Sequence, residues 1–290
     1  MQKIVFIVNP VSGNGAQRHI QEWVRNYLDH SKFEPVFQFT EAPKHASELA
    51  KIASQNYKYI VAVGGDGSVN EVAKGIIGTD SVLGIIPFGS GNGLARYLNI
   101  PMSPKKAIEL LAKETIKTID TLLINNELSV NVAGAGFDGY IAHKFAGLQD
   151  RGFKAYINLT LHEYWNYRPN TYEIIIDGKS TLHEALLVSV ANSSQFGNNA
   201  HIAPLAKVDD GIFDITVIRP TPLYYAPVMA TRLFAKNLQN SRYYTGYKCK
   251  EATIRSKQPI FGHIDGEAVE LGTEIKIRIQ PASLQILVGK

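Results

Sequence analysis

The chain has 290 residues, 45% hydrophobic and 19% charged, a globular composition that excludes disordered and collagen-like classes. The formal net charge of +4 does not demand nucleic acid but suits an anionic partner. The single cysteine, Cys249, excludes an internal disulfide and zinc sites of the Cys₄ or Cys₂His₂ type. No apolar run reaches the roughly 20 residues of a transmembrane helix, and the N-terminus lacks a signal-peptide pattern, so we expect a soluble, intracellular protein.

In the first 120 residues, short apolar runs alternate with helical segments. The runs that predict strands are residues 4–8, 33–39, 59–63 and 82–86. Helical patterns follow them at 16–28, at 44–54, after Ser68 and at 104–113. This alternation predicts an α/β domain with a doubly wound, mostly parallel sheet.

The rhythm changes after about Asp120. Short strand patterns occur at residues 121–124, 128–133, 172–176, 186–191, 213–218, 252–255 and 275–279, with helical inserts at about 139–166 and 223–238. Asn125-Asn126 and Asp177-Gly178 are typical hairpin turns. The second half is therefore predicted to be a mostly antiparallel β domain, with the boundary near residue 122.

Three glycine-rich loops follow strands of the first half, at residues 9–15, 64–71 and 89–93. In a parallel sheet, all three lie at the carboxyl edge, where open α/β folds bind ligands. Glycines let backbone N–H groups approach phosphate oxygens, and the next helix adds a favourable field. One such loop is as easily a plain strand-to-helix turn, but three on one edge, one of them with a carboxylate, favour a phosphate site.

Two familiar nucleotide patterns do not fit. Gly178-Lys179-Ser180 has Glu173 where a Walker A loop needs glycine, so it is interpreted as a hairpin turn. A literal G-x-G-x-x-G occurs at residues 134–139, but among antiparallel signals in mid-chain. We interpret it as a close turn rather than a dinucleotide site.

With these loops the chain resembles the diacylglycerol kinase catalytic family, which includes bacterial diacylglycerol kinases and sphingosine kinases. The resemblance implies an α/β ATP-binding domain, similar to those of NAD kinase and phosphofructokinase, over residues 1–122. It also implies a β-sandwich domain for the lipid substrate over 123–290, whose last strand, at about 280–290, packs back onto the first domain. The matching motifs are Asn9-Pro10-x-Ser12-Gly13, Gly64-Gly65-Asp66-Gly67-Ser68-x-Asn70-Glu71, Gly89-Ser90-Gly91-Asn92, Gly136-Phe137-Asp138, Pro204-x-Ala206, Asp209-Asp210-Gly211 and Asp265-Gly266-Glu267.

Carried over by position, the resemblance implies roles for individual residues. Asp66 would organise magnesium and the phosphates, Glu267 would be the general base, and Asp265 would be a second catalytic acid beside it. Asp210, with backbone carbonyls at Lys207 and Ile212, would hold a structural magnesium ion, although the same residues also fit a plain turn. The positions implied to bind ATP are Asn9, Pro10, Ser12, Gly13, Thr40, Gly65, Asp66, Gly67, Ser68, Asn70, Glu71, Ser90 and Asn92.

The chain also departs from the family pattern. Gly93 stands where many bacterial members have Asp, and Asn14 stands where the family often has Lys. Arg18 is a candidate for the missing cation. These departures leave open a network between Asp66 and Asp120 and the branch of the family.

A basic segment without acidic residues extends from residue 215 to 250 and carries six Lys or Arg residues. Within it, residues 222–238 mix Tyr224, Tyr225 and Phe234 with Arg232 and Lys236. Aromatic and cationic side chains together are typical of an element that lies at an anionic membrane surface. A helix packed on the β domain with a solvated basic face explains the pattern equally well.

The resulting prediction is a lipid kinase that uses ATP and magnesium and phosphorylates a lipid hydroxyl, most simply diacylglycerol to phosphatidic acid. Alternatives are a kinase of the same fold for a sphingoid base or another lipid alcohol, a nucleotide-binding regulator without turnover, and a soluble-substrate kinase. We expect a cytoplasmic enzyme in peripheral contact with the anionic inner membrane face, with no nucleic-acid partner. Because relatives often dimerise, a homodimer is a further expectation.

Overall fold

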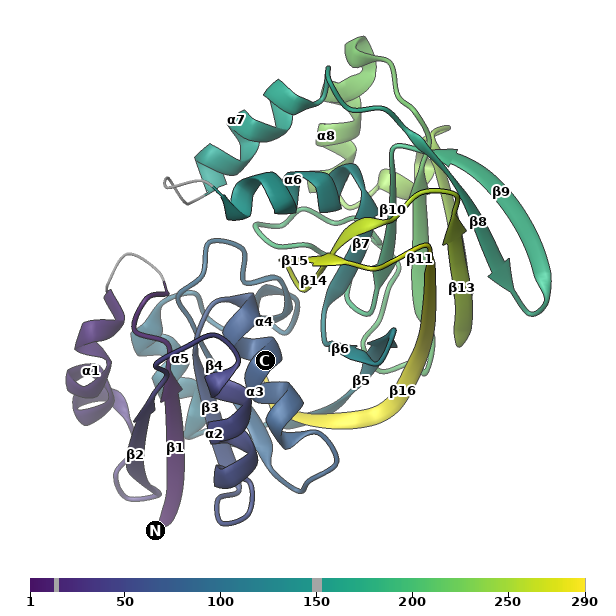
Figure 1. The fold of residues 1–290 in the computed structure, drawn as a ribbon. Helices are drawn as coiled ribbons and strands as arrows, with labels where there is room; N and C mark the ends of the chain where they lie inside the picture. Colours follow the sequence, from purple (N-terminus) through teal and green to yellow (C-terminus); the bar gives the residue numbers. More distant parts are fainter. Residues whose placement is uncertain (13–15, 148–152, 290) are drawn as a thin grey trace. The chain divides into compact units, whose positions relative to one another are not determined.

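The computed structural model describes residues 1–12, 16–147 and 153–289, which form two compact units (Figure 1). The first unit contains residues 1–120 and the C-terminal segment from Ala282, and the second contains residues 121–281. The chain passes between them twice, within strand β5 (Ile116–Ile124) and within strand β16 (Glu274–Leu287). Each unit therefore has its own core and is described separately.

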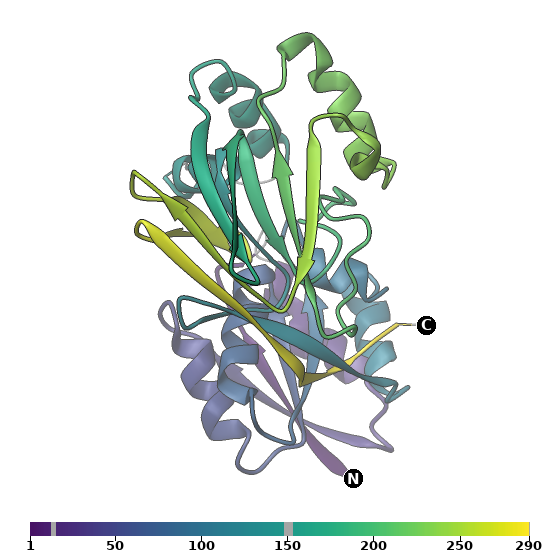
Figure 2. The ribbon, with the colours of Figure 1, turned by 90° about the vertical axis from the view of Figure 1, so that its right-hand side faces the viewer.

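The first unit is built on a parallel sheet with the strand order β2-β1-β3-β4-β16. Residues 4–8 of β1 are at most 1% exposed, as expected for a strand covered on both faces. Helix α1 packs with α5 and α2 with α3, and the helices cover both faces of the sheet (Figures 1 and 2). The predicted doubly wound fold is confirmed. The elements are β1 (Gln2–Val8), a 3₁₀ turn (Ala16–His19), α1 (Ile20–Tyr27), β2 (Phe33–Phe39), α2 (His45–Ala53), β3 (Tyr59–Gly64), α3 (Asp66–Ile76), β4 (Val82–Pro87), α4 (Gly93–Tyr97) and α5 (Pro104–Leu111).

The second unit is an antiparallel β sandwich, which confirms the predicted fold class. One sheet has the order β12-β11-β10-β7-β14-β15, and the other joins β9, β8, β13, the first part of β16, β5 and β6. The core lies between them, with Tyr172 and Ile254 from one sheet and Phe213 and Ile215 from the other, all at most 2% exposed. The elements are β6 (Glu127–Ser129), β7 (Val132–Gly136), α6 (Phe137–Ala146), α7 (Phe153–Glu163), β8 (Asn170–Ile176), β9 (Lys179–Ala185), β10 (Leu187–Ala191), β11 (Phe213–Ile218), a 3₁₀ turn (Leu223–Tyr225), α8 (Ala226–Phe234), a 3₁₀ turn (Leu238–Asn240), β12 (Tyr244–Cys249), β13 (Glu251–Ser256), β14 (Phe261–Ile264) and β15 (Glu267–Glu270).

Strand β16 pairs within both units. Its first part is antiparallel to β13, with Glu251 opposite Arg278, and its last part is parallel to β4, with Gln285 opposite Val82. At the crossing, the Ala282 N–H donates to Asp120 Oδ1 at 2.7 Å. Asp120 thus stabilises the backbone where the strand enters the first unit.

Some predicted element boundaries were wrong. The strand expected at 128–133 is two strands, β6 and β7, because the intervening N–H groups of Val130 and Asn131 bond to the Asp265 carboxylate instead of to a strand. The helix expected at 139–166 is observed as α6 and α7. Strands β9, β12, β14 and β15 and helix α4 were not predicted. In residues 1–12, 16–147 and 153–289, no helix is long and apolar enough to span a membrane.

Candidate active site

The first two glycine loops contact each other directly at the carboxyl ends of β1 and β3. Asn9 Nδ2 donates to Ser68 Oγ at 3.2 Å, which joins the loop after β1 to the first turn of α3. Within the first loop, the Val11 N–H donates to Asn9 Oδ1 at 3.1 Å and Ser12 Oγ donates to the Asn9 carbonyl at 2.9 Å. Asn9 is therefore the residue that shapes this loop and connects it to the second.

The second and third loops are joined through Asp66. Its Oδ2 and Oδ1 atoms accept from the N–H groups of Asn92 and Gly93, both at 2.8 Å. A Cβ atom added at Gly89 would lie 2.6 Å from the Gly65 Cα, so the two loops approach more closely than side chains would permit. The three loops therefore meet at one edge of the first unit.

Asn92 fixes the shape of the third loop. It has a left-handed backbone, with φ of 52°, and is only 7% exposed. Its side chain accepts from the Gly89 N–H at 3.0 Å and donates to the Gly89 carbonyl at 2.6 Å. The buried amide thus spans the turn and holds Ser90, which is exposed, at its tip.

Glu71 lies on α3 and anchors a neighbouring helix. Its two carboxylate oxygens accept from the N–H groups of Lys44 and Ala46, at 3.0 and 3.1 Å, at the start of α2. A carboxylate at a helix N-terminus bonds to otherwise unpaired N–H groups and interacts favourably with the helix dipole. Thr40, at the end of β2, donates its N–H to the Val8 carbonyl at 2.9 Å, so it lies beside the end of β1.

The residues predicted to bind ATP fall into two groups by exposure. Ser68, Asn70 and Asn92 are buried. Pro10 and Ser90 are exposed, and Asn9, Ser12, Thr40, Gly65, Asp66, Gly67 and Glu71 are partly exposed. The exposed and partly exposed members are accessible to a ligand, although Asn9 and Asp66 also hold the loops together. Gly13 and Asn14 lie outside the described residues, and Arg18 is exposed in the 3₁₀ turn before α1.

In the second unit, Asp265 is an internal anchor. It is 3% exposed and forms the turn between β14 and β15 with Gly266, at φ values of 49° and 87°. Its Oδ1 atom accepts from Ser129 Oγ at 2.7 Å and from the N–H groups of Asn131 and Val132, at 3.0 and 3.1 Å. Its Oδ2 atom accepts from the Val130 N–H at 2.8 Å. A carboxylate with this many donors holds the turn firmly.

Glu267, two residues later, is exposed at the start of β15. The left-handed turn therefore directs two neighbouring acids into opposite environments. Asp265 enters the protein and Glu267 remains accessible to a substrate.

A buried histidine that the sequence analysis missed also supports this turn. His263 is 5% exposed, and its Nδ1 atom accepts from the Gly266 N–H at 3.3 Å. Its Nε2 atom lies 3.4 Å from Oδ2 of Asp138, which is also buried. An imidazole that accepts at Nδ1 carries its proton at Nε2, facing the carboxylate. The available signal was Asp138 in the family motif Gly136-Phe137-Asp138.

The predicted structural magnesium site already has a cation beside it. Lys248 Nζ lies 4.0 Å from Asp210 Oδ2 and 3.5 Å from Asp214 Oδ2, and it donates to the Leu205 carbonyl at 3.3 Å. Asp210 and Lys207 are exposed, and Asp210 Oδ1 accepts from the Ile212 N–H at 3.4 Å. The described part of the chain has no group of three or more His, Cys, Asp or Glu side chains placed for a metal. One carboxylate with backbone carbonyls is still a donor set that magnesium accepts.

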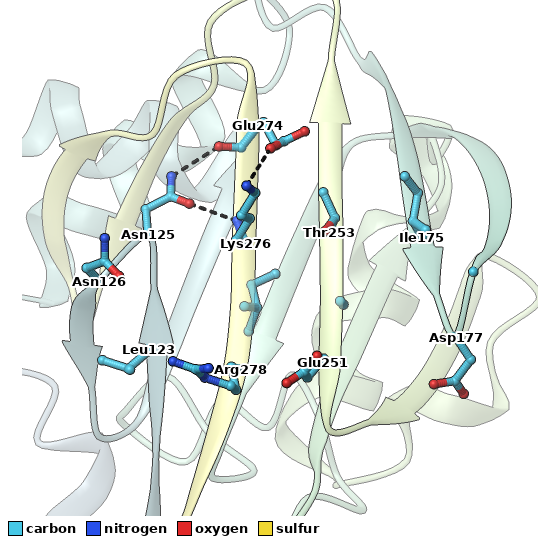
Figure 3. A pocket seen from close by; sticks show the side chains of 13 residues that line it. Leu123, Asn125, Asn126, Ile175, Asp177, Glu251, Thr253, Glu274, Lys276 and Arg278 are labelled. Atoms are coloured by element: carbon cyan, nitrogen blue, oxygen red, sulfur yellow. Dashed lines mark hydrogen bonds and ion pairs between the residues drawn. The ribbon is translucent and has the colours of Figure 1, made fainter.

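A large open groove of the second unit lies elsewhere. It has a volume of about 760 Å³ and crosses strands β5, β16, β13 and β8 (Figure 3). Within the groove, the Asn125 side chain accepts from the Lys276 N–H at 2.8 Å and donates to the Glu274 carbonyl at 3.1 Å. Asn125 therefore bonds to the backbone of β16. No predicted site residue lines this groove.

Comparison with known proteins covers both units. The family model described as "Diacylglycerol kinase catalytic domain" matches residues 3–124, and the model described as "YegS C-terminal NAD kinase beta sandwich-like domain" matches residues 131–288. The chain is 26% identical to a diacylglycerol kinase of Bacillus subtilis, over 92% of this chain and 90% of that one. It is 28% identical to a diacylglycerol kinase of Mycobacterium tuberculosis, over 74% and 72% of the two chains.

A solved structure supports the fold. The crystal structure of a diacylglycerol kinase from Bacillus anthracis superposes with a TM-score of 0.78 at 22% identity, and the match covers 99% of this chain and 97% of that one. The architecture of both units is therefore found in a known protein.

Proposed function

Because the chain belongs to the diacylglycerol kinase catalytic-domain family of lipid kinases, with a YegS-type C-terminal domain, we propose that diacylglycerol is its acceptor and phosphatidic acid its product. Membership of this kinase family implies the use of ATP. Relatives from two organisms carry the name diacylglycerol kinase, which supports this acceptor over other lipid alcohols. The observation that supports ATP binding is the joining of three glycine loops through Asn9, Asp66 and Asn92.

The proposed reaction depends on positioning more than on covalent chemistry. Phosphoryl transfer needs an in-line arrangement, stabilisation of charge on the phosphate oxygens, and an acceptor for the proton of the attacking hydroxyl. In our proposal the loop N–H groups and Ser90 hold the phosphates. The acceptor oxygen bonds to the terminal phosphorus of ATP, ADP leaves, and the proton passes to the Glu267 carboxylate. Magnesium, when bound, would neutralise phosphate charge, with Asp66 orienting it.

Asp66 and Asp265 have positioning roles in this proposal. Both Asp66 oxygens accept backbone N–H groups, and in our proposal the carboxylate also orients the water of a bound cation. Asp265 would act through the turn that presents Glu267. A direct catalytic contact of Asp265 stays a prediction.

A structural magnesium ion at Asp210, with the carbonyls of Lys207 and Ile212, is also proposed. Because the Lys248 ammonium lies between Asp210 and Asp214, it competes with that ion for the same carboxylate charge. We expect Lys248→Met to increase the rise in melting temperature that magnesium produces. If magnesium stabilises neither protein, there is no structural metal at this place.

The proposed setting is the cytoplasmic side of the inner membrane, with peripheral contact through the basic aromatic segment at 222–238. Support comes from the exposure of Tyr224 (76%) and Phe234 (45%) in this segment. We also propose a homodimer, which sedimentation at several protein concentrations would test. A mass that stays at 32.0 kDa would exclude it.

The experiment that tests the function uses radiolabelled ATP with a panel of lipid alcohols in detergent micelles. We expect label in phosphatidic acid when diacylglycerol is supplied. Label in a phosphorylated sphingoid base or another lipid would instead support the alternative acceptor. ATP binding without consumption on any lipid would support the regulator.

A further inference from the structure

Two arginines converge where strands β11 and β12 meet. Arg219 follows the end of β11, and Arg242 lies two residues before β12, whose Tyr244 pairs with Ile218. A guanidinium nitrogen of Arg219 donates to the Arg242 carbonyl, and the Arg219 N–H donates to the Tyr243 carbonyl at 2.9 Å. Both side chains line an open groove of about 750 Å³, together with Leu182, His183, Glu184, Pro220, Tyr243 and Thr245. We refer to this as the arginine groove.

The two guanidinium groups of the arginine groove form no ion pair. Glu184 also lines the groove, but in residues 1–12, 16–147 and 153–289 no carboxylate lies within 4 Å of either guanidinium. Arg242 instead lies over the rings of Tyr243 and Tyr225, with distances of 4.9 and 5.7 Å to their centroids, and donates to Tyr243 Oη at 2.8 Å. Burial, followed by the charge of Arg219, lowers the pKa of His183, which lines the same groove.

Two guanidinium groups that line one groove and form no ion pair match the chemistry of a phosphate group. Each guanidinium offers N–H donors in a planar fork that suits two phosphate oxygens. The stacking on Tyr225 and Tyr243 holds Arg242 in place before any ligand arrives, so little side-chain entropy is lost on binding.

Large apolar side chains are exposed at the same end of this unit. None of the described residues 223–234 is buried. The end of α7 is fixed to this region because Tyr164 Oη donates to the Thr221 carbonyl. Figures 1 and 2 both show α7 and α8 at one end of the unit. We define the α7–α8 surface by its exposed members: Leu161 (61%), Trp165 (71%), Tyr224 (76%), Val228 (40%) and Phe234 (45%).

We propose that the arginine groove binds the phosphate group of an anionic membrane lipid while the α7–α8 surface enters the membrane interface beside it. A lipid rather than a soluble phosphate is the occupant because a soluble anion would gain nothing from exposed Trp165, Tyr224 and Phe234. Aromatic side chains favour the headgroup zone, and cations bind anionic headgroups there. The inference rests on the proposed function only in that the substrate is a lipid, and this site is separate from the predicted catalytic residues.

Vesicle co-sedimentation tests the inference with the double variant Arg219→Gln/Arg242→Gln. The matched control is Lys276→Gln/Arg278→Gln, which removes two charges from the same unit outside the arginine groove. On vesicles of phosphatidylcholine with phosphatidylglycerol, we expect the groove variant to bind about tenfold more weakly than wild type, and the control to lose about twofold or less. Equal losses in the two variants would mean nonspecific attraction and would overturn the proposal.

Further measurements distinguish a membrane lipid from a free anion and separate this proposal from the proposed function. We expect Trp165 fluorescence to shift to shorter wavelength on vesicles, and the shift to disappear in Trp165→Phe. If inorganic phosphate binds the groove in calorimetry but vesicle binding is the same in wild type and groove variant, the site takes a free anion and the proposal is wrong. Activity on short-chain diacylglycerol in neutral micelles should be unchanged in the groove variant. If wild type also has no activity on diacylglycerol, the proposed function is wrong, but the result of the vesicle experiment still tests the lipid site.

Discussion

The two units use carboxylates in different ways around their predicted site residues. In the first unit, Asp66 and Glu71 each join two backbone N–H groups of a neighbouring segment, and both side chains remain partly exposed. In the second unit, two acids of one turn have separate roles, one as a structural anchor and the other as an exposed group. Asp265 is buried with four donors, and Glu267 is exposed.

The comparison shows that one residue type can anchor a loop, face a ligand or do both. Where one carboxylate does both, its loss should change structure and activity together. Where two adjacent residues share the work, stability and activity should separate.

The largest effect is expected for Glu267→Gln. Because the amide cannot accept the hydroxyl proton, turnover should fall by about 10²–10⁴-fold, the usual contribution of a general base. The side chain is exposed, so the melting temperature and ATP affinity should stay near wild type. Steady-state kinetics in micelles with a parallel nucleotide-binding assay measures both. Near-normal turnover would remove Glu267 from the mechanism.

The opposite outcome is expected for Asp265→Asn. The substitution puts an NH₂ group against backbone N–H donors and should lower the free energy of unfolding by about 3 kcal/mol. The chain offers a close control in Asp177→Asn, since Asp177-Gly178 is also a left-handed turn, with φ values of 50° and 74°, but is exposed. Urea unfolding of both variants gives the difference. If the two lose equal stability, the buried donors around Asp265 have no special role.

These residues also show how far the sequence alone could be interpreted. Continuous apolar runs predicted β3 and β4 to within one residue, because a strand buried on both faces leaves a clear signal. Strand β2 has the predicted bounds although only Phe33 in it is buried, because its sequence alternates. Strand β9 was missed because its sequence has neither a continuous apolar run nor a regular alternation, and six of its seven residues are not buried. The break between β6 and β7 was not predictable, because its cause, Asp265, lies 135 residues along the chain from Val130.

The candidate site was predictable in kind but not in detail. The sequence identified the acids of the glycine loop and of the turn through their motifs. It did not reveal that Glu71 caps α2 or that Asp265 is enclosed, because both depend on which backbone N–H groups the fold leaves unpaired. His263 had no pattern of its own, since its partners, Asp138 and the Gly266 N–H, come together only in the folded unit.

The stability of the second unit should also depend on pH, because this unit buries His201. The side chain is 2% exposed, its Nδ1 lies 3.0 Å from Ser194 Oγ, and burial, followed by the charge of Lys236, lowers its pKa to about 4. A depressed histidine pKa favours the fold above the unfolded pKa near 6.5, and this contribution is lost as the pH falls toward 4. Between pH 7 and pH 5, the loss from this residue should be about 2 kcal/mol.

The measurement is urea unfolding at both pH values for wild type and His201→Gln. The variant should be less stable at pH 7 but lose about 2 kcal/mol less than wild type on acidification. Identical pH dependence in the two proteins would mean that His201 is protonated in the fold as easily as in the unfolded chain.

The smallest effect is expected for Glu71→Gln, and it decides whether one carboxylate in the first unit has two roles. The amide oxygen still accepts one of the two N–H groups at the start of α2, so the free energy of unfolding should fall by only about 1 kcal/mol. Glu48→Gln, an exposed acid in the first turn of the same helix, controls for the change in helix charge. If Glu71 also contacts bound nucleotide, its variant should raise the KM for ATP while the Glu48 variant does not. A loss of stability with an unchanged KM would make Glu71 an anchor alone. In the first unit, only Asp66 would then be expected both to anchor a neighbouring segment and to act on the bound nucleotide.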